Sequence, residues 1–283
     1  MRLGLGSYAF RWAMGIGTPS PAALGSVPDL IRETADLGCE VLQLADLDAL
    51  ESASAAELTD LRAHAASAGV ALQTGLTGAT VERLTDHLRI ATSLGADLAR
   101  VVLHGRGIED EREAARALTR LAPDYEAAGV TLAIENHFLT SSASLVELVA
   151  EIDSRAVGLT VDVANSIACQ EWPDQTIAAL APFVRCLHLK DYRIEPSPDG
   201  VGAAVIGAPL AQGWSDIAAI VEEIAPHAPE GMAVILEQWS PAGSSLQDAI
   251  TTETRWRRES AMTARSHPAL NPLWSTGGTR AAV

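Results

Sequence analysis

Four side chains that can bind a metal ion end four successive apolar segments of this chain. The segments read Leu-Ala-Ile-Glu135, Leu-Thr-Val-Asp162, Arg-Cys-Leu-His188 and Val-Ile-Leu-Glu237. Side chains alternate between the two faces of a strand, so if the preceding aliphatic residue faces outward, each of the four faces inward. Three carboxylates that point at one another in an apolar interior need a proton or a cation to balance their charge. The pattern therefore predicts a metal site with Glu135, Asp162, His188 and Glu237 as its ligands.

The types of ligand indicate which metal the site favours. One imidazole and three carboxylates suit an octahedral Mn²⁺, Mg²⁺ or Co²⁺ ion with positions left for substrate oxygens. Zn²⁺ is less favoured because it prefers fewer carboxylates and a smaller set of ligands. We therefore expect a divalent metal as the cofactor, Mn²⁺ before Mg²⁺ or Co²⁺, and no other cofactor-binding residues.

Each of these four residues also has an ordinary structural explanation when it is considered alone. A single carboxylate at the end of a strand more often caps a loop, and a single histidine in an apolar segment is more often a core residue. The metal interpretation depends on the four residues together, because they recur at the same place in four consecutive segments.

Short apolar segments alternate with helical patterns along the whole chain. A glycine just beyond a helix is the usual stop, because it adopts a left-handed backbone, and Gly38, Gly69, Gly95 and Gly129 stand at such places. We expect strands at Leu3–Phe10, Cys39–Ala45, Ala71–Leu76, Leu98–Leu103, Thr131–Glu135, Val157–Val163, Val184–Leu189 and Met232–Glu237. We expect helices at Val27–Leu37, Ala53–Ala68, Thr80–Leu94, Glu109–Ala128, Ser142–Ile152, Asp174–Ala181, Trp214–Ala225 and Ser245–Ala264.

Alternating strands and helices predict an α/β fold, and eight such units favour a closed (β/α)₈ TIM barrel. A doubly wound open sheet is the alternative, but Gly4-Leu5-Gly6 lies inside the first strand and no helix follows it, unlike a phosphate loop. Residues 1–265 are expected to form a single barrel domain, and residues 266–283 an irregular C-terminal tail. Barrel enzymes keep their active sites at the C-terminal ends of the strands, where the four ligands stand. The connection Ile194–Gly213 is long enough to form a lid there.

Charge and composition exclude several classes of partner. Acidic residues outnumber Lys plus Arg by 36 to 20, and the net charge of −16 disfavours nucleic acid and anionic membranes as partners. No apolar segment reaches the roughly 18 residues that span a bilayer. Three cysteines without CxxC spacing suit a reducing compartment. We expect a cytoplasmic protein that acts on a small sugar-like molecule, and a homo-oligomer is one alternative that the sequence leaves open.

The motifs around the four ligands resemble those of the sugar phosphate isomerase/epimerase superfamily. The matching segments are Ile134-Glu135-Asn136-His137, Val161-Asp162-Val163-Ala164-Asn165, His188-Leu189-Lys190-Asp191 and Leu236-Glu237. The resemblance spans nearly the whole chain and implies a xylose isomerase-like TIM barrel in which Glu135, Asp162, His188 and Glu237 bind the metal. In the ketose epimerases of this superfamily the two glutamates are also the acid/base pair, which implies Glu135 and Glu237 as catalytic residues here.

The leading hypothesis from the sequence is an isomerase or epimerase of a keto-sugar or sugar acid. A metal bound to a carbonyl and a neighbouring hydroxyl acidifies the C–H bond between them and stabilises the enediolate, and a carboxylate on each face moves the proton. Two departures count against a plain ketose 3-epimerase. Asn165 stands where many members have histidine, and Lys190-Asp191 stands where such epimerases tend to have Gly-Glu.

The alternative is a lyase, a decarboxylase or dehydratase that acts on a 3-oxo sugar acid through the same enediolate. The segment Phe10-Arg11-Trp12-Ala13-Met14-Gly15 resembles the branch of the superfamily that contains the 3-oxo-isoapionate decarboxylases. DNA-repair endonucleases share this barrel but need several metals and more histidines than the seven present here. A non-catalytic sugar-binding barrel is disfavoured because the set of ligands is intact.

Seven further residues are candidates for substrate binding, and they are Arg11, Trp12, His104, His137, Asn165, Lys190 and Arg193. All of them lie at or just beyond the end of a predicted strand. The cations suit a carboxylate, a phosphate or a developing oxyanion, although an ion pair with a neighbouring acid is the alternative for Lys190. The alternatives are a core or capping role for His104, a role in orienting a metal ligand for His137 and a packing role for Trp12.

Overall fold

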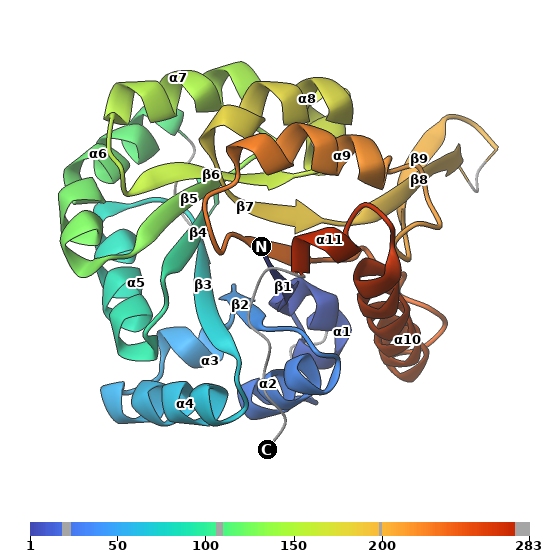
Figure 1. Cartoon of the computed structure of the whole chain (residues 1–283), viewed down its shortest axis with the longest axis horizontal. Helices are drawn as coiled ribbons and strands as arrows, with labels where there is room; N and C mark the ends of the chain where they lie inside the picture. The colour runs from blue at the N-terminus through green and yellow to red at the C-terminus, as the bar shows by residue number, and fades with distance from the viewer. Residues whose placement is uncertain (19–23, 106–109, 198–199, 275–283) are drawn as a thin grey trace.

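Eight parallel strands close into a barrel in the order β1-β10-β7-β6-β5-β4-β3-β2 (Figure 1). They are β1 (Arg2–Gly6), β2 (Val41–Ala45), β3 (Ala71–Thr77), β4 (Leu98–Val102), β5 (Thr131–Glu135), β6 (Val157–Asp162), β7 (Val184–Leu189) and β10 (Ala233–Leu236). This computed structural model describes residues 1–18, 24–105, 110–197 and 200–274. The closed barrel confirms the predicted fold, and the open-sheet alternative is wrong.

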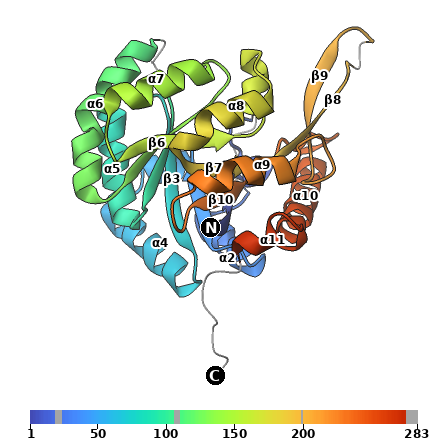
Figure 2. The same cartoon turned by 45° about the horizontal axis from the view of Figure 1, so that its top comes forward.

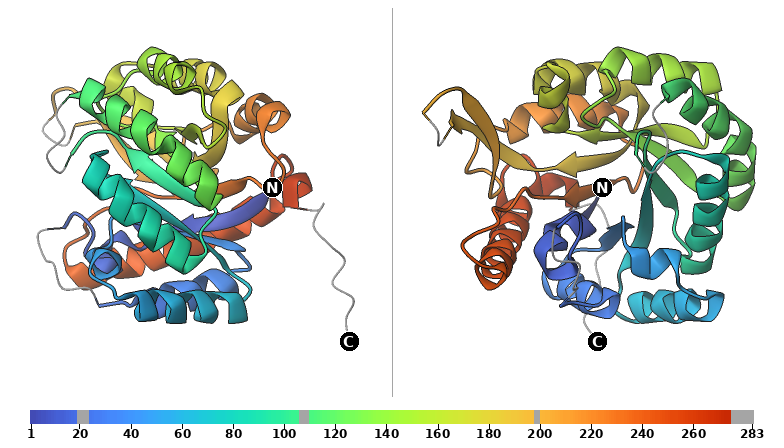
Figure 3. Two further views of the ribbon diagram at one scale, coloured as in Figure 1. Left: turned by 90° about the vertical axis from the view of Figure 1, so that its left-hand side faces the viewer. Right: turned by 180° about the vertical axis from the view of Figure 1, so that it is seen from behind.

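Helices surround the barrel and cover the outer faces of its strands (Figure 3). The longer ones are α2 (Val27–Asp36), α4 (Ala55–Ser67), α5 (Val81–Leu94), α6 (Glu111–Ala128), α7 (Ser142–Ile152), α8 (Pro173–Leu180), α9 (Ile217–Ile224) and α10 (Leu246–Ser266). Short helical turns are η1 (Ser7–Phe10), α1 (Arg11–Met14), α3 (Asp48–Glu51), η2 (Asn165–Cys169), η3 (Ala181–Phe183), η4 (Ala225–His227) and α11 (Asn271–Trp274). Every helix predicted from the sequence is present, and Glu109, the predicted start of one, lies outside the described residues.

The ends of the helices follow from local chemistry. At the start of α2, the Ser26 side chain accepts from Asp29 N while the Asp29 carboxylate accepts from Ser26 N, and Ser54 and Glu57 repeat this arrangement at α4. The glycines predicted to stop four helices have φ angles of 67°, 72°, 67° and 70°, the left-handed conformation that terminates a helix.

The first predicted strand, Leu3–Phe10, is shorter than expected. β1 ends at Gly6, and Ser7–Phe10 forms η1. Ser7 explains the break, because its hydroxyl donates to Ala45 O (2.8 Å) and accepts from Ala45 N (3.0 Å). A side chain thus replaces the backbone ladder at this point, and an apolar sequence pattern does not reveal such a replacement.

The connection Ile194–Gly213, expected to be irregular, instead contains an antiparallel hairpin. β8 (Asp191–Pro196) pairs with β9 (Ala203–Ala208), and the hairpin projects beyond the ring of helices (Figure 2). Val205 and Ile206 of β9 are exposed. Because the outer part of the hairpin has no buried face, its sequence lacks the alternation by which strands are recognised.

The predicted tail begins where α10 ends at Ser266. The short helix α11 packs back on the barrel, since the Met1 ammonium donates to Leu273 O (3.1 Å) and Trp274 Nε1 donates to Ala264 O (2.9 Å). Residues 275–283 of this tail lie outside the described part of the chain. Among the helices that are described, none is long and apolar enough to cross a membrane.

The interior of the barrel changes from apolar to polar along its axis. Near the N-terminal ends of the strands lies a buried cluster made of Val41, Leu98, Ala133, Cys186, Ala233 and Ile235. Two residues further along these strands, on the same face, stand the buried residues Gln43, Arg100, Glu135, His188 and Glu237. The barrel therefore supports a layer of buried polar side chains near its C-terminal end.

His87 on the inner face of α5 predicts how acid affects stability. It is 5% exposed, and neither ring nitrogen has a hydrogen-bond partner among the described residues. Burial lowers the pKa of His87 from 6.5 to about 4, although Glu51 opposes the shift. Between these two pH values the unfolded chain binds more protons than the folded one, so the free energy of unfolding falls as the pH falls, by up to about 3 kcal/mol.

Urea unfolding of the wild type and His87→Leu, measured from pH 7.5 to 4, tests this expectation. As the pH falls through this window, the free energy of unfolding of the wild type should decrease relative to that of the variant. A difference that stays constant with pH would show that His87 does not titrate as its burial requires.

Candidate active site

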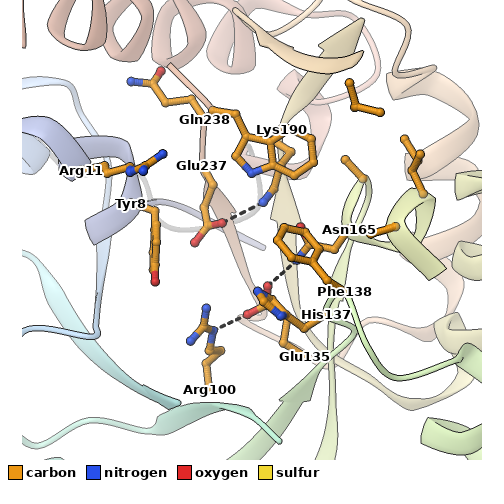
Figure 4. A pocket seen from close by; sticks show the side chains of 15 residues that line it. Tyr8, Arg11, Arg100, Glu135, His137, Phe138, Asn165, Lys190, Glu237 and Gln238 are labelled. Atoms are coloured by element: carbon orange, nitrogen blue, oxygen red, sulfur yellow. Dashed lines mark hydrogen bonds and ion pairs between the residues drawn. The ribbon is translucent and has the colours of Figure 1, made fainter. Parts of the chain in front are cut away.

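A cavity of about 600 Å³ opens at the C-terminal end of the barrel (Figure 4). A volume of this size suits a small-molecule ligand. The cavity is lined by Tyr8, Arg11, Arg100, Glu135, His137, Phe138, Ala164, Asn165, Ile167, Ala168, Lys190, Val205, Glu237, Gln238 and Trp239. Asp162 and His188 are fully buried and contribute no surface to it.

The four predicted metal ligands lie together at the base of this cavity. His188 Nδ1 is 3.6 Å from Glu135 Oε1, 3.9 Å from Asp162 Oδ2 and 3.5 Å from Glu237 Oε1. One atom each from Glu135, Asp162 and His188 lies within 4.8 Å of the others, which is a spacing that can hold a metal ion. Glu237 falls outside that group of three, but its carboxylate borders the same imidazole nitrogen.

The donor atoms fit a divalent cation. Within the described part of the chain, His188 Nδ1 and Asp162 Oδ2 are buried without a hydrogen-bond partner. The His188 distances of 3.5 to 3.9 Å are too long for hydrogen bonds. Ligand atoms about 2.0–2.2 Å from a shared ion lie roughly 3–4 Å apart, which is the spacing found here. An orphaned nitrogen that faces three carboxylates is a reason to expect a cation between them.

Arg100 from the middle of β4 holds Glu135 in its charged form. Its Nε donates to Glu135 Oε2, its Nη1 lies 3.2 Å from Asp46 Oδ2, and its guanidinium lies over the Tyr8 ring at 5.9 Å (Figure 4). Burial alone would raise the pKa of Glu135, but Arg100 and then His188 outweigh it and hold that pKa well below its usual range. Glu135 is therefore an ionised carboxylate.

Lys190, the residue after β7, is a second buried cation. Its Nζ lies 2.6 Å from Asp162 Oδ2, outside hydrogen-bond geometry, and it donates to Glu237 Oε2 at 3.1 Å. It also lies 4.9 Å from the centre of the Trp239 ring. Burial would lower the pKa of Lys190, but Asp162 and Glu237 raise it above its ordinary value, so the ammonium stays charged.

Burial and neighbouring charges shift the pKa values of Asp162, Glu237 and His188 in different directions. Burial raises the pKa of Asp162 despite Lys190, whereas for Glu237 the effect of burial is overcome by His188 and Lys190, which lower its pKa. Burial would lower the pKa of His188, but Glu237 and Glu135 raise it well above its usual value. The carboxylates thus attract one more positive charge at His188, either as a proton or as a metal ion.

Local hydrogen bonds set the positions of the ligands. Asn136, next to Glu135, donates to Asp162 O (2.9 Å) and accepts from Asp162 N (2.7 Å), which joins the ends of β5 and β6. Asp162 Oδ1 accepts from Ala164 N and Asn165 N, each at 2.9 Å, and so turns the chain into η2. Asn165 then donates to Glu135 Oε1 at 2.9 Å. Asn165 thus holds the proposed ligand Glu135 and also lines the cavity.

The structure separates the remaining candidates into two groups. Arg11, His137, Asn165 and Lys190 line the cavity. Burial lowers the pKa of His137, whose ring stacks on Phe138 at 4.3 Å. The other three, Trp12, His104 and Arg193, are not among its lining residues, so their predicted contacts with substrate are not supported.

Each of these three has another contact that explains its place. Trp12 Nε1 donates to Ser240 O (3.1 Å), and His104 Nε2 lies 3.1 Å from both Glu111 Oε1 and Thr140 Oγ1. Arg193 extends along the hairpin and donates to Gln212 O. The packing alternatives weighed for Trp12 and His104 account for what is observed.

Sequence reasoning missed several residues of the cavity, of which Arg100 is the most important. A charged residue in the apolar strand Leu-Ala-Arg100-Val-Val, on the face that points inward, was a signal of the same kind as the four ligands. Phe138, Gln238 and Trp239 were also not predicted, and they follow β5 and β10 in loops.

Residues 31–265 match the family described as Xylose isomerase-like TIM barrel. A protein of Pectobacterium atrosepticum, named 3-oxo-isoapionate decarboxylase, is 30% identical over 261 residues, which make up 92% of this chain and 94% of that protein. These matches confirm the resemblance that the motifs indicated.

Solved structures of enzymes share the fold at low sequence identity. D-psicose 3-epimerase in the presence of D-fructose aligns with a TM-score of 0.71 at 15% identity, over 95% of this chain and 100% of that chain. A xylose isomerase-like TIM barrel protein from Mycobacterium smegmatis in complex with magnesium has a TM-score of 0.65 at 17% identity, over 92% of this chain and 97% of that chain. Similarity at this level shows a shared fold.

Proposed function

The chain belongs to the xylose isomerase-like TIM barrel family, and we propose that it is a divalent-metal-dependent lyase that removes CO₂ from a 3-oxo sugar acid. The observation that carries this proposal is the buried ammonium of Lys190, which lines the cavity beside the four predicted ligands. A buried cation there suits an acidic substrate better than a neutral sugar. The name of the relative from P. atrosepticum denotes the same kind of reaction.

Glu135, Asp162, His188 and Glu237 are the proposed metal ligands. When bound, a divalent cation there would supply positive charge that stabilises the negative charge that develops on the substrate oxygens. The donor set favours Mn²⁺, with Mg²⁺ and Co²⁺ as alternatives, and the magnesium complex of the M. smegmatis protein is compatible with such a choice.

Lys190 binds the carboxylate of the acid and later returns a proton. Its Nζ donates to Glu237 Oε2 and lies 2.6 Å from Asp162 Oδ2, and an ammonium with three N–H donors can also donate to a ligand in the cavity. The bond between the carboxylate carbon and its neighbour breaks and CO₂ leaves. The electron pair of that bond forms a double bond to the 3-oxo carbon, and the π pair of the carbonyl moves onto its oxygen. As the carbonyl forms again, the neighbouring carbon takes a proton from Lys190, which recovers one from solvent.

The other residues of the cavity hold the site and exclude water. Arg100 keeps Glu135 ionised, so that this carboxylate stays available to a cation rather than to a proton. Phe138 and Trp239 lie 6.4 Å apart in an edge-on arrangement and form an apolar part of the wall. Water exclusion strengthens each charge interaction inside the cavity.

An isomerase or epimerase of a keto-sugar or sugar acid is the second candidate. Glu135 and Glu237 place two carboxylate oxygens within 3.6 Å of the same imidazole nitrogen, and both line the cavity. They would serve as the acid/base pair that removes and returns a proton. Asn165 and Lys190 favour the lyase, because neither residue is needed to move a proton between two glutamates.

Incubation in D₂O separates the two functions. We expect Mn²⁺-loaded enzyme to release CO₂ from at least one member of a panel of 3-oxo sugar acids, with one deuterium in the product at the carbon that lost CO₂. Deuterium exchange into intact keto-sugars without CO₂ release would favour the isomerase instead. A panel that gives neither CO₂ nor exchange would contradict both functions.

A further inference from the structure

A chain of buried amides runs from the proposed metal site to the opposite end of the barrel. His188 Nε2 lies 2.7 Å from Gln43 Oε1, and Gln43 Nε2 donates to Gln73 Oε1 at 3.2 Å. Gln73 Nε2 donates to Asp97 Oδ1 at 3.1 Å. Asp97, which precedes β4 at the N-terminal end of the barrel, also pairs with Arg2 at 2.8 Å. The side chains of Gln43, Gln73, Asp97 and Arg2 thus connect His188 to the surface at the N-terminal end of the barrel.

The carboxylate at the end of this chain determines the direction of every hydrogen bond in it. Asp97 can only accept, so Gln73 turns its NH₂ group toward Asp97 and its oxygen toward Gln43. Gln43 must then donate to Gln73, and its own oxygen faces His188. That oxygen accepts from His188 Nε2–H, so Nδ1 is the ring nitrogen that faces the three carboxylates and takes a proton or a metal ion there.

We propose that Gln43 is the positioning residue that presents His188 Nδ1 to the metal, and that Asp97 fixes its orientation through Gln73. The proposal rests on the metal site proposed above. A histidine ligand usually donates its second ring N–H to an acceptor that sets its tautomer and ring angle. Here the acceptor is a neutral amide whose orientation is controlled from the other end of the barrel.

A packing role for the glutamines is the alternative, and their burial argues against it. Gln43 is 1% exposed and Gln73 is 2% exposed, inside a barrel whose adjacent layer is apolar. A buried amide without partners costs about 1–3 kcal/mol, so an apolar residue would serve better if only volume mattered. The hydrogen bonds to His188 and Asp97 explain why polar amides occupy these buried positions.

Two substitutions at Gln43 distinguish a positioning role from a packing role, because the two roles predict opposite orders of Mn²⁺ affinity for the variants. Gln43→Met keeps the length of the side chain but removes the acceptor, so we expect Mn²⁺ to bind about 10- to 100-fold more weakly. Gln43→Glu keeps an oxygen next to His188 Nε2–H, so we expect Mn²⁺ affinity within roughly threefold of the wild type. A packing role predicts the opposite, since Met fits an apolar site and a buried carboxylate does not.

Calorimetric titration with Mn²⁺ of the wild type and both variants, each checked for folding by its melting temperature, gives the first readout. ¹⁵N-histidine protein loaded with ¹¹³Cd²⁺ gives the second, since one-bond coupling between cadmium and nitrogen identifies the ligating atom. We expect coupling to Nδ1 of His188 in the wild type and in Gln43→Glu, and a weakened or lost coupling in Gln43→Met.

The outcomes distinguish this inference from the function on which it rests. If the wild type binds neither ion, the metal site itself is wrong. If the wild type binds Mn²⁺ and Gln43→Met binds it equally well, or if cadmium couples to Nε2, then Gln43 does not orient His188.

Discussion

Asp162→Asn is expected to abolish Mn²⁺ binding at micromolar concentrations and to lower kcat/KM for decarboxylation about a thousandfold or more. Asparagine keeps the oxygen that accepts from Ala164 N and Asn165 N, so the turn into η2 is preserved. It replaces the orphaned Oδ2 by an NH₂ group that carries no charge and cannot bind a cation. Calorimetric titration with Mn²⁺ and initial rates of CO₂ release measure the two losses.

Asp191→Asn is the matched control for this prediction. Asp191 is also a buried carboxylate just beyond a barrel strand, but it accepts from Tyr192 N, Gly213 N and Ser215 N and does not line the cavity. We expect its replacement to affect stability and to leave Mn²⁺ affinity near that of the wild type. Equal losses of Mn²⁺ in both variants would mean that the effect of Asp162 is structural.

Lys190→Met is expected to lower the rate of decarboxylation about a thousandfold while Mn²⁺ binding is kept or strengthened. The ammonium pairs with Asp162 Oδ2 and Glu237 Oε2, so its removal would leave both carboxylates available to a metal ion alone. The metal-free variant should be less stable than the wild type, because two buried charges lose a partner. Added Mn²⁺ should restore much of that stability, which thermal melting with and without the ion will measure.

Arg193→Met provides the comparison for Lys190. Arg193 lies three residues further along the chain, is exposed on β8 and donates to Gln212 O rather than into the cavity. Its replacement should leave the rate nearly unchanged. Were Lys190→Met to retain full decarboxylase activity, the proposed role of its ammonium would be wrong.

The barrel and the meeting of the proposed metal ligands could be predicted because both follow from local periodicity. Each barrel strand is a short apolar segment, and the alternation of such segments with helices restricts the topology to a parallel sheet with right-handed crossovers, for which eight units favour closure. Side chains along a strand alternate strictly between its two faces. Glu135, Asp162 and His188 stand at equivalent positions of their strands, so their side chains lie close together in the closed barrel.

The rest of the cavity could not be predicted because it depends on contacts distant in sequence. The inward-facing position of Arg100 was visible in its strand, but its pairing with Glu135 across two neighbouring strands was not, because no local pattern relates the two residues. Trp239 follows β10 in a loop that packs closely against Gly207 of the hairpin β8–β9, and that hairpin was itself not predicted. Arg193, expected just beyond a barrel strand, lies on β8 of the same hairpin.

One measurement tests the central claim most directly, which is anomalous X-ray diffraction from crystals of the enzyme grown with Mn²⁺ and recorded at the manganese edge. We predict a single strong peak at the base of the cavity, in contact with Glu135, Asp162, His188 Nδ1 and Glu237. No peak at that place, or a peak held by other residues, would contradict the account.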